Sequence, residues 1–392
     1  MIYVGIDVAK DKHDVHIRDG NGCILENHFT VANSRSGFNH LLSVIDKYEP
    51  KPQNVKVGLE ATGRYCDNLC DCLAGNSKIV YRINPALANN FCKGRTLRST
   101  KTDAMDARGI TDMLMSGMDL EPYRVKVYHK NQLKSLARLL DDCKTELAKQ
   151  KVSLSNWVVV NFPELESAGL FSSIHCNTVY ELLKKYPGPQ YVAAARIKSL
   201  AGLIRKASNG ACRSEELAVK LHDAAATSIG YASPADSLEL KLLFGRIDVL
   251  EKQIKVVEKE ILATGRKANI TIGTIPGVGE VQAMCIAAEI GDINRFSSPD
   301  KLLAYAGMSP TKHDSGKKQN SKGHIEKRGS RYLRKYLYRA ASLIWLHNPI
   351  FAEYYKKKTG EGKHHCVAVI HMVKKLVRII YAMMKSGEVY RT

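Results

Sequence analysis

The order of local patterns in the first 100 residues limits the fold of this 392-residue chain more than any other feature. Three strand-like segments come first: YVGID, DVHIRD and ILENHFTV, with a GNG turn between the last two. Helix-like and strand-like segments then alternate: SGFNHLLSVIDKY with Ser36 as its cap, VKVGLEAT, YCDNLCDCLAG ending at Gly75, and KIVYRINP. We expect three meandering strands, then parallel strands joined through helices.

This order is typical of an RNase H-like domain, in which the first and fourth strands are neighbours. Asp7 closes the first strand and Glu60 has a similar place in the fourth, although acids are seldom buried in central strands unless paired or bound to metal. KTDAMDAR adds Asp103 and Asp106 on one face at the start of a helix. Together these side chains predict an all-oxygen pocket that suits Mg²⁺ or Mn²⁺, the ions that assist phosphoryl transfer.

Each acid also has a plainer interpretation. Asp103 and Asp106 alone would most often be helix-capping residues, and Asp7 and Glu60 alone could be ordinary strand-end residues. The coincidence of all four favours the metal pocket. Three nearby acids fall in or beyond the first turn and are expected to be solvated: Asp11, Asp14 and Asp19.

The middle of the chain is expected to be helical. Residues 236–264 carry apolar side chains at alternating steps of three and four, which is coiled-coil spacing: Leu243, Ile247, Leu250, Ile254, Val257 and Ile261. Their partner is either a helix near 131–160 of the same chain or a second copy. We therefore divide the chain into a metal-binding α/β domain at 1–128, a helical and coiled-coil region at 129–268, and a basic helical domain at 269–392.

Positive charge is concentrated at the C-terminal end. The net charge is +20, and residues 301–392 contain 20 Lys and Arg against 5 Asp and Glu, three quarters of the excess. A concentrated excess indicates a polyanionic partner. We expect nucleic acid, with an anionic membrane surface as the weaker alternative.

The sequence also predicts where the protein is located and whether its cysteines are reduced. No apolar run reaches the roughly 18 residues of a membrane span, and MIYVGIDVAK lacks the pattern of a signal peptide, so we expect a cytoplasmic protein. The ten scattered cysteines favour reduced thiols. The cluster CDNLCDC at 66–72 lacks a second ligand pair, so helix cysteines are favoured over a structural zinc site.

Two C-terminal motifs point to phosphate. In TIPGVGEVQAMCIAAEIGDI (274–293), PGVG followed by an Ala- and Ile-rich helix is typical of a helix-hairpin-helix, whose glycines let the turn approach phosphate. An ordinary tight turn is the alternative. Residues 309–341 form a Gly- and Lys-rich loop and then a helix, which predicts a phosphate-binding surface. The helix carries Tyr332, Tyr336 and Tyr338 at a spacing that favours a core role over base stacking.

Taken in order, the motifs resemble those of a known family over nearly the whole chain. They are GIDVAK, GLEATGRY and KTDAMDAR in the first part, then IPGVGEVQA, LLAYAGMSP, DSGKK and KRGSRYLRKYLYRAA. The chain resembles the DEDD-type insertion-sequence transposases, which are related to the Piv invertases and include bridge-RNA-guided recombinases.

The resemblance implies roles for particular residues. The N-terminal domain would be RuvC-like, and the C-terminal transposase domain would supply Ser315 as a nucleophile that forms a phosphoserine link to DNA. Many members have a hydroxyl residue just before this serine, but this chain has Asp314, so Ser309 and Ser321 remain alternatives. The implied ligands of Mg²⁺ (or Mn²⁺) are Asp7, Glu60, Asp103 and Asp106.

The resemblance also implies partners. These are double-stranded donor and target DNA, a structured noncoding guide RNA, and further copies of the chain in a dimer or tetramer. Two other functions fit the residues: a metal-dependent, structure-selective nuclease without a covalent intermediate, and a non-catalytic nucleic-acid-binding scaffold.

Overall fold

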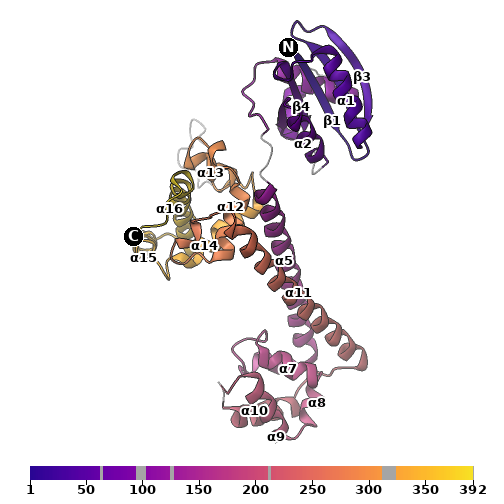
Figure 1. Ribbon diagram of the computed structural model, residues 1–392. Helices are drawn as coiled ribbons and strands as arrows, with labels where there is room; N and C mark the ends of the chain where they lie inside the picture. The colour runs from indigo at the N-terminus through magenta and orange to yellow at the C-terminus, as the bar shows by residue number, and fades with distance from the viewer. Residues whose placement is uncertain (62–64, 94–102, 124–127, 211–212, 311–323, 392) are drawn as a thin grey trace, which may run out of the picture. The chain divides into compact units, whose positions relative to one another are not determined.

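A five-stranded sheet lies in the N-terminal unit, residues 1–127, of the computed structural model (Figure 1). The structure describes residues 1–61, 65–93, 103–123, 128–210, 213–310 and 324–391. The strands are β1 (Ile2–Val8), β2 (Lys12–Asp19), β3 (Ile24–Ala32), β4 (Val55–Glu60) and β5 (Ile79–Ile83). Their order is β3-β2-β1-β4-β5, with β1–β3 antiparallel in sequence order and β1, β4 and β5 parallel. The predicted meander and the neighbouring first and fourth strands are confirmed.

Helices cover both faces of this sheet. They are α1 (Arg35–Tyr48), the 3₁₀ turn η1 (Pro52–Asn54), α2 (Asp67–Gly75), α3 (Pro85–Lys93) and α4 (Asp103–Met115). Because side chains alternate along a strand, Val4 and Ile6 of β1 share a core with Leu41 of α1 and Leu69 of α2, whereas Gly5 faces α4.

Two local predictions in this unit have opposite outcomes. The cap of α1 is Ser34 rather than Ser36, because the Ser34 hydroxyl accepts a hydrogen bond from the Gly37 amide at 3.2 Å. The helix predicted at the cysteine cluster is confirmed as α2, where Cys70 is buried and Cys72 is half-buried.

Residues 128–392 form a second, mainly helical unit. Its first half contains α5 (Tyr128–Asn161), α6 (Glu164–Ser167), α7 (Asn177–Lys185), α8 (Pro189–Ala193), α9 (Ile197–Ala207), α10 (Ser214–Ala226) and α11 (Pro234–Arg266). Its second half contains η2 (Ile272–Thr274), α12 (Glu280–Ile290), η3 (Ile293–Arg295), α13 (Pro299–Tyr305), α14 (Arg331–Ile344), α15 (Pro349–Gly360) and α16 (His365–Ser386).

The long helices α5 and α11 run side by side (Figure 1). Ile254 and Ile261 of α11 share a core with Leu133 and Leu140 of α5. Of the two partners that the coiled-coil spacing left open, the seam therefore uses the helix of the same chain. A capping box formed by the side chains and backbone of Ser233 and Asp236 explains why α11 begins at Pro234.

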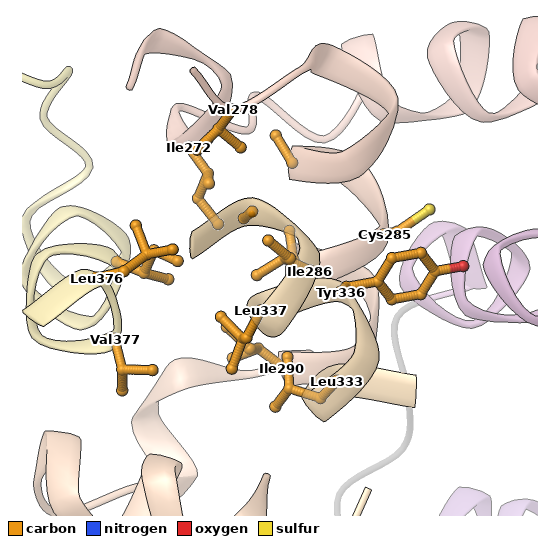
Figure 2. Close-up of a cluster of buried hydrophobic side chains, with 14 of the residues drawn as sticks. Ile272, Val278, Cys285, Ile286, Ile290, Leu333, Tyr336, Leu337, Leu376 and Val377 are labelled. Atoms are coloured by element: carbon orange, nitrogen blue, oxygen red, sulfur yellow. The ribbon is translucent and has the colours of Figure 1, made fainter. Parts of the chain in front are cut away.

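Helices α12, α14 and α16 meet in the C-terminal core, where Ile286, Leu337 and Leu376 converge (Figure 2). Tyr336 is buried there and its hydroxyl donates to the carbonyl of Ala137 in α5 at 2.7 Å. Tyr332 and Tyr338 pack against the same core, so the core role predicted for all three tyrosines is confirmed.

The glycine turn before α12 packs partly against the protein itself. Gly277 has a φ of +90°, and a Cβ there would lie 3.0 Å from the Cα of Ile344 in α14. Gly279 faces open space. A 3₁₀ turn precedes this segment and α11 ends at Arg266, so the helix-hairpin-helix stays a prediction.

A fully buried carboxylate joins three parts of the second unit. Glu289 of α12 accepts from the Arg138 guanidinium of α5 at 2.8 Å and from the hydroxyl of Ser330, the cap of α14, at 3.0 Å. The ammonium of Lys134 lies 3.8 Å away. A buried charge with this many donors stabilises the arrangement only as long as the donors remain.

Replacement of Glu289 by alanine should therefore lower the free energy of unfolding by about 2–3 kcal/mol, since it removes the hydrogen bonds that Arg138 and Ser330 donate to a buried carboxylate. The matched control is Asp248→Ala, which removes an exposed pair with Lys184 and should cost at most about 1 kcal/mol. Urea unfolding followed by tryptophan fluorescence measures both, because Trp157 and Trp345 lie in this unit. Equal losses in the two variants would contradict the assignment.

Candidate functional site

Two glycines bring α4 against the centre of the sheet. Gly5 of β1 and Gly58 of β4 are register partners in neighbouring parallel strands. A Cβ at Gly5 would lie 2.2 Å from the Ala107 carbonyl oxygen of α4, and one at Gly58 would lie 2.8 Å from the Cγ2 of Ile110. Neither position has space for a side chain, so the helix backbone rests directly on β1.

The same spacing sets the positions of the four predicted ligands. Asp7 follows Gly5 by two residues and Glu60 follows Gly58 by two, so both acids share the α4 face of the sheet. Along α4, the two aspartates precede the contact residues Ala107 and Ile110 by four, which is about one helical turn. The first turn of α4 therefore carries its acids, Asp103 and Asp106, toward the strand ends.

The pKa of Asp7 reflects its burial and the carboxylates near it. Burial raises the pKa of Asp7 to about 6, and repulsion from Asp106, Glu60, Asp103 and, more weakly, Asp14 contributes to that rise. Asp7 and Glu60 are half-buried, whereas Asp103 is exposed. The predicted convergence of the four acids at one end of the sheet agrees with this mutual repulsion.

The donor set suits a hard divalent cation, since it consists of carboxylate oxygens. Their spacing is looser than a coordination shell. In the part of the chain that the structure describes, no group of three or more His, Cys, Asp or Glu side chains is arranged closely enough to hold a metal ion. The ligand assignment therefore stays a prediction.

A shallow pocket adjoins these acids on the side of α3. It is lined by Glu60 of β4, Asp106 and Ile110 of α4, and Pro85 and Asn89 of α3.

Asp14 was expected to be solvated, and that prediction is wrong. It is only 2% exposed and lies opposite Asp7 in the register of β1 and β2. Its carboxylate accepts from the ring of His28 at 2.7 Å and from the hydroxyl of Thr30 at 3.0 Å. The register could have revealed this: the four residues 9–12 connect Val8 to its partner His13, which places Asp7 opposite Asp14.

Polar contacts also tie α4 to β2. The Arg18 guanidinium of β2 bonds the Asp112 carboxylate of α4 at 2.6 Å, and it also donates to the ring of His16 at 3.0 Å. Burial lowers the pKa of His16, so the ring is neutral and can accept this bond. These contacts fix the direction of α4 across the sheet.

The predicted nucleophile Ser315 lies outside the described residues, as does Ser321. The segments on either side are described. The Glu326 amide donates to the Ser309 carbonyl at 3.0 Å, and the Ser330 amide donates to the Tyr305 carbonyl at 2.8 Å. Pro310 and Ile325 form an antiparallel bridge. These contacts bring the two ends of the intervening segment together beside the buried Glu289.

Two family models match this chain, one in its N-terminal part and one in its C-terminal part. A family model described as "Transposase" matches residues 4–163, and one described as "Transposase IS116/IS110/IS902 family" matches residues 270–356. The chain belongs to this family of insertion-sequence transposases. The recognition made from the sequence motifs is thus confirmed.

Relatives of this transposase extend over its full length. An insertion element IS116 uncharacterized 44.8 kDa protein of Streptomyces clavuligerus is 27% identical, over 99% of this chain and 96% of that protein. A pilin gene-inverting protein of Moraxella bovis is 22% identical, over 98% and 96%. A transposase for insertion sequence element IS1111A of Coxiella burnetii is 30% identical over shorter shares, 39% and 43%.

Membership of the family implies a DNA-recombining enzyme. Among the described residues, none of the helices combines the length and apolar character needed to cross a bilayer.

The close approach of α4 makes a first prediction for this site. Gly5→Ala should destabilise the N-terminal unit by about 3 kcal/mol or more, because a Cβ at 2.2 Å from a backbone oxygen forces α4 away from β1. The control is Gly75→Ala, whose Cβ meets nothing within 4 Å and should change stability by less than about 1 kcal/mol. Hydrogen exchange of peptides from residues 1–61 follows this unit separately. Unchanged protection in Gly5→Ala would refute the packing argument.

The raised pKa of Asp7 makes a second prediction. Its folded-state pKa of about 6 exceeds the unfolded value of about 4, so the folded state binds more protons between these pH values. The contribution of Asp7 to stability is thus greatest below pH 4 and is lost as the pH rises through 6. In protein stripped of metal, Asp7→Asn should raise the melting temperature relative to wild type by an amount that grows from pH 4 to pH 7. A pH-independent difference would exclude this titration.

Proposed function

We propose that this transposase cuts and rejoins DNA for a mobile element through a phosphoserine link at Ser315. The observation that carries the proposal is the gathering of four carboxylates from β1, β4 and α4 in a chain that belongs to a transposase family. The carboxylates supply one half of a composite active site, and the basic C-terminal part, with Ser315, supplies the other.

The N-terminal unit would be a RuvC-like catalytic domain. Its strand order, with acids at the ends of β1 and β4, supports this assignment. A divalent ion, Mg²⁺ or Mn²⁺, would neutralise charge on the phosphate and stabilise the leaving oxygen. The protein residues that would hold it are Asp7, Glu60, Asp103 and Asp106, of which Asp7 is largely ionised above pH 6.

The covalent step would proceed at Ser315. Its hydroxyl oxygen forms a bond to a DNA phosphorus, the bond from that phosphorus to the adjacent sugar oxygen breaks, and the released oxygen takes a proton. A hydroxyl at another DNA end then reverses the step and frees the serine, so the energy of the phosphodiester bond is conserved. Ser309 and Ser321 remain alternatives to Ser315, which is the serine of the SG motif.

The chain would act in three domains, 1–128, 129–268 and 269–392. The basic last domain, with its helix-hairpin-helix, would bind the backbone of double-stranded donor and target DNA. A structured noncoding RNA would supply the address by base pairing. The concentrated positive charge of residues 301–392 supports a polyanionic partner of either kind.

Assembly as a homo-oligomer, a dimer or tetramer, would bring the serine of one subunit to the acids of another. The seam facing α5 is used within the chain. A second row of exposed apolar side chains follows α11 at steps of four and seven and supports contact with another copy: Leu238, Leu242, Val249 and Val256.

Covalent trapping tests the serine. Wild-type protein with Mg²⁺, DNA spanning the ends of its element and RNA transcribed from the element's flank should give a protein–DNA adduct that survives detergent. Ser315→Ala should reduce adduct formation at least about a hundredfold, since no other group replaces a nucleophile. Ser309→Ala is the matched control and should form the adduct.

The same assay separates the alternatives. Cleavage to free 5′-phosphates without an adduct would indicate the metal-dependent nuclease, in which water attacks. DNA binding without cleavage or an adduct, equal in wild type, Asp7→Asn and Glu60→Gln, would indicate a non-catalytic scaffold and exclude both enzymes.

A further inference from the structure

A lysine stands beside the acids at the start of β2. The Lys12 ammonium lies 3.6 Å from the Oδ2 of Asp103 and 3.4 Å from the Oδ2 of Asp14. It thus links a residue of α4 that is predicted to bind metal with a buried residue of the sheet. The position is accessible to ions, because the Lys12 and Asp103 side chains are 53% and 62% exposed.

Asp14 holds this lysine from a fixed position. It is buried in β2, and its two oxygens have different partners: Oδ1 accepts from His28 and from Thr30, its register partner in β3, while Oδ2 faces Lys12. The donors on Oδ1 fix the orientation of the carboxylate. The second oxygen, Oδ2, therefore attracts the Lys12 ammonium and keeps it near Asp103 in the first turn of α4.

The Lys12 contact engages an oxygen that a metal ion would need. Carboxylate ligands contact divalent ions at about 2.0–2.6 Å, well inside an ion-pair distance. An ammonium 3.6 Å from the Oδ2 of Asp103 lowers the negative potential that attracts a dication to that oxygen.

We propose that Lys12, held by Asp14, is a built-in counter-cation that neutralises Asp103 while no divalent ion is bound and must release it before Asp103 can join a metal ion. The inference rests on the proposed function, because it takes Asp103 as a ligand. It assigns Lys12 and Asp14 a positioning role in the timing of metal binding. Removing a lysine that only supported the fold would not strengthen metal binding.

The sign of the effect on metal affinity distinguishes this role. Lys12→Met should bind Mn²⁺ about three- to tenfold more tightly than wild type at low ionic strength, since a competing charge within a few ångströms is removed. Lys12→Arg keeps the charge and should bind as wild type does. A lysine that helped to build the site would show the opposite sign, weaker binding after its removal.

The test is calorimetric titration of the full chain with Mn²⁺ alone. Lys10→Met is the matched control: it removes the same charge two residues earlier, and Lys10 forms no ion pair among the residues that the structure describes. Its affinity should stay within about twofold of wild type. Circular dichroism in EDTA verifies that each variant is folded.

The outcomes separate the two proposals. Tighter binding by Lys12→Met than by Lys10→Met supports the counter-cation. Equal or weaker binding by Lys12→Met, or no binding by any variant, overturns it. Asp7→Asn reports on the metal assignment itself: if it binds Mn²⁺ as wild type does, the ion lies elsewhere and the proposed metal site fails whatever Lys12 does.

Discussion

The backbone of α4 touches the sheet at Gly5, and the arrangement of the acids depends on that contact. A helix kept at the usual distance by side chains would hold its first turn several ångströms farther from the strand ends. Gly5 and Gly58, paired across β1 and β4, remove that spacing at the centre of the sheet. The catalytic candidates are thus positioned by two residues that carry no functional group.

Gathering the acids has an energetic cost that the surroundings reduce only in part. Asp7 is half-buried among like charges, which raises its pKa, and its neighbour across the register is the still more buried Asp14. His28, Thr30 and Lys12 compensate Asp14, whereas burial and neighbouring like charges raise the pKa of Asp7. Local destabilisation of this kind is common at functional sites, where the group is kept for its chemistry.

In the second unit, hydrogen bonds join the residues on either side of the polar segment between Tyr305 and Ser330. The Ser330 amide donates to the Tyr305 carbonyl, and the Ser330 hydroxyl donates to the buried Glu289 carboxylate. Arg138 carries the connection into α5. One carboxylate thereby links Ser330, the cap of α14, to the long helix α5.

Sequence alone determined the strand order, the helix at the cysteine cluster, the core roles of three tyrosines and the family. These features follow from local periodicity and from motifs, which nearby residues encode. Asp7 and Glu60 could also be selected from sequence, because carboxylates in apolar strands are rare. Tertiary structure decided what depends on contacts between distant segments. The coiled-coil pattern could not reveal its partner, since an apolar seam fits a helix of the same chain or of another. Asp14 was predicted to be solvated, because its burial depends on the strand register and on packing by β3. Ser34 rather than Ser36 caps α1, because the path of the chain into the helix decides which hydroxyl reaches a free amide.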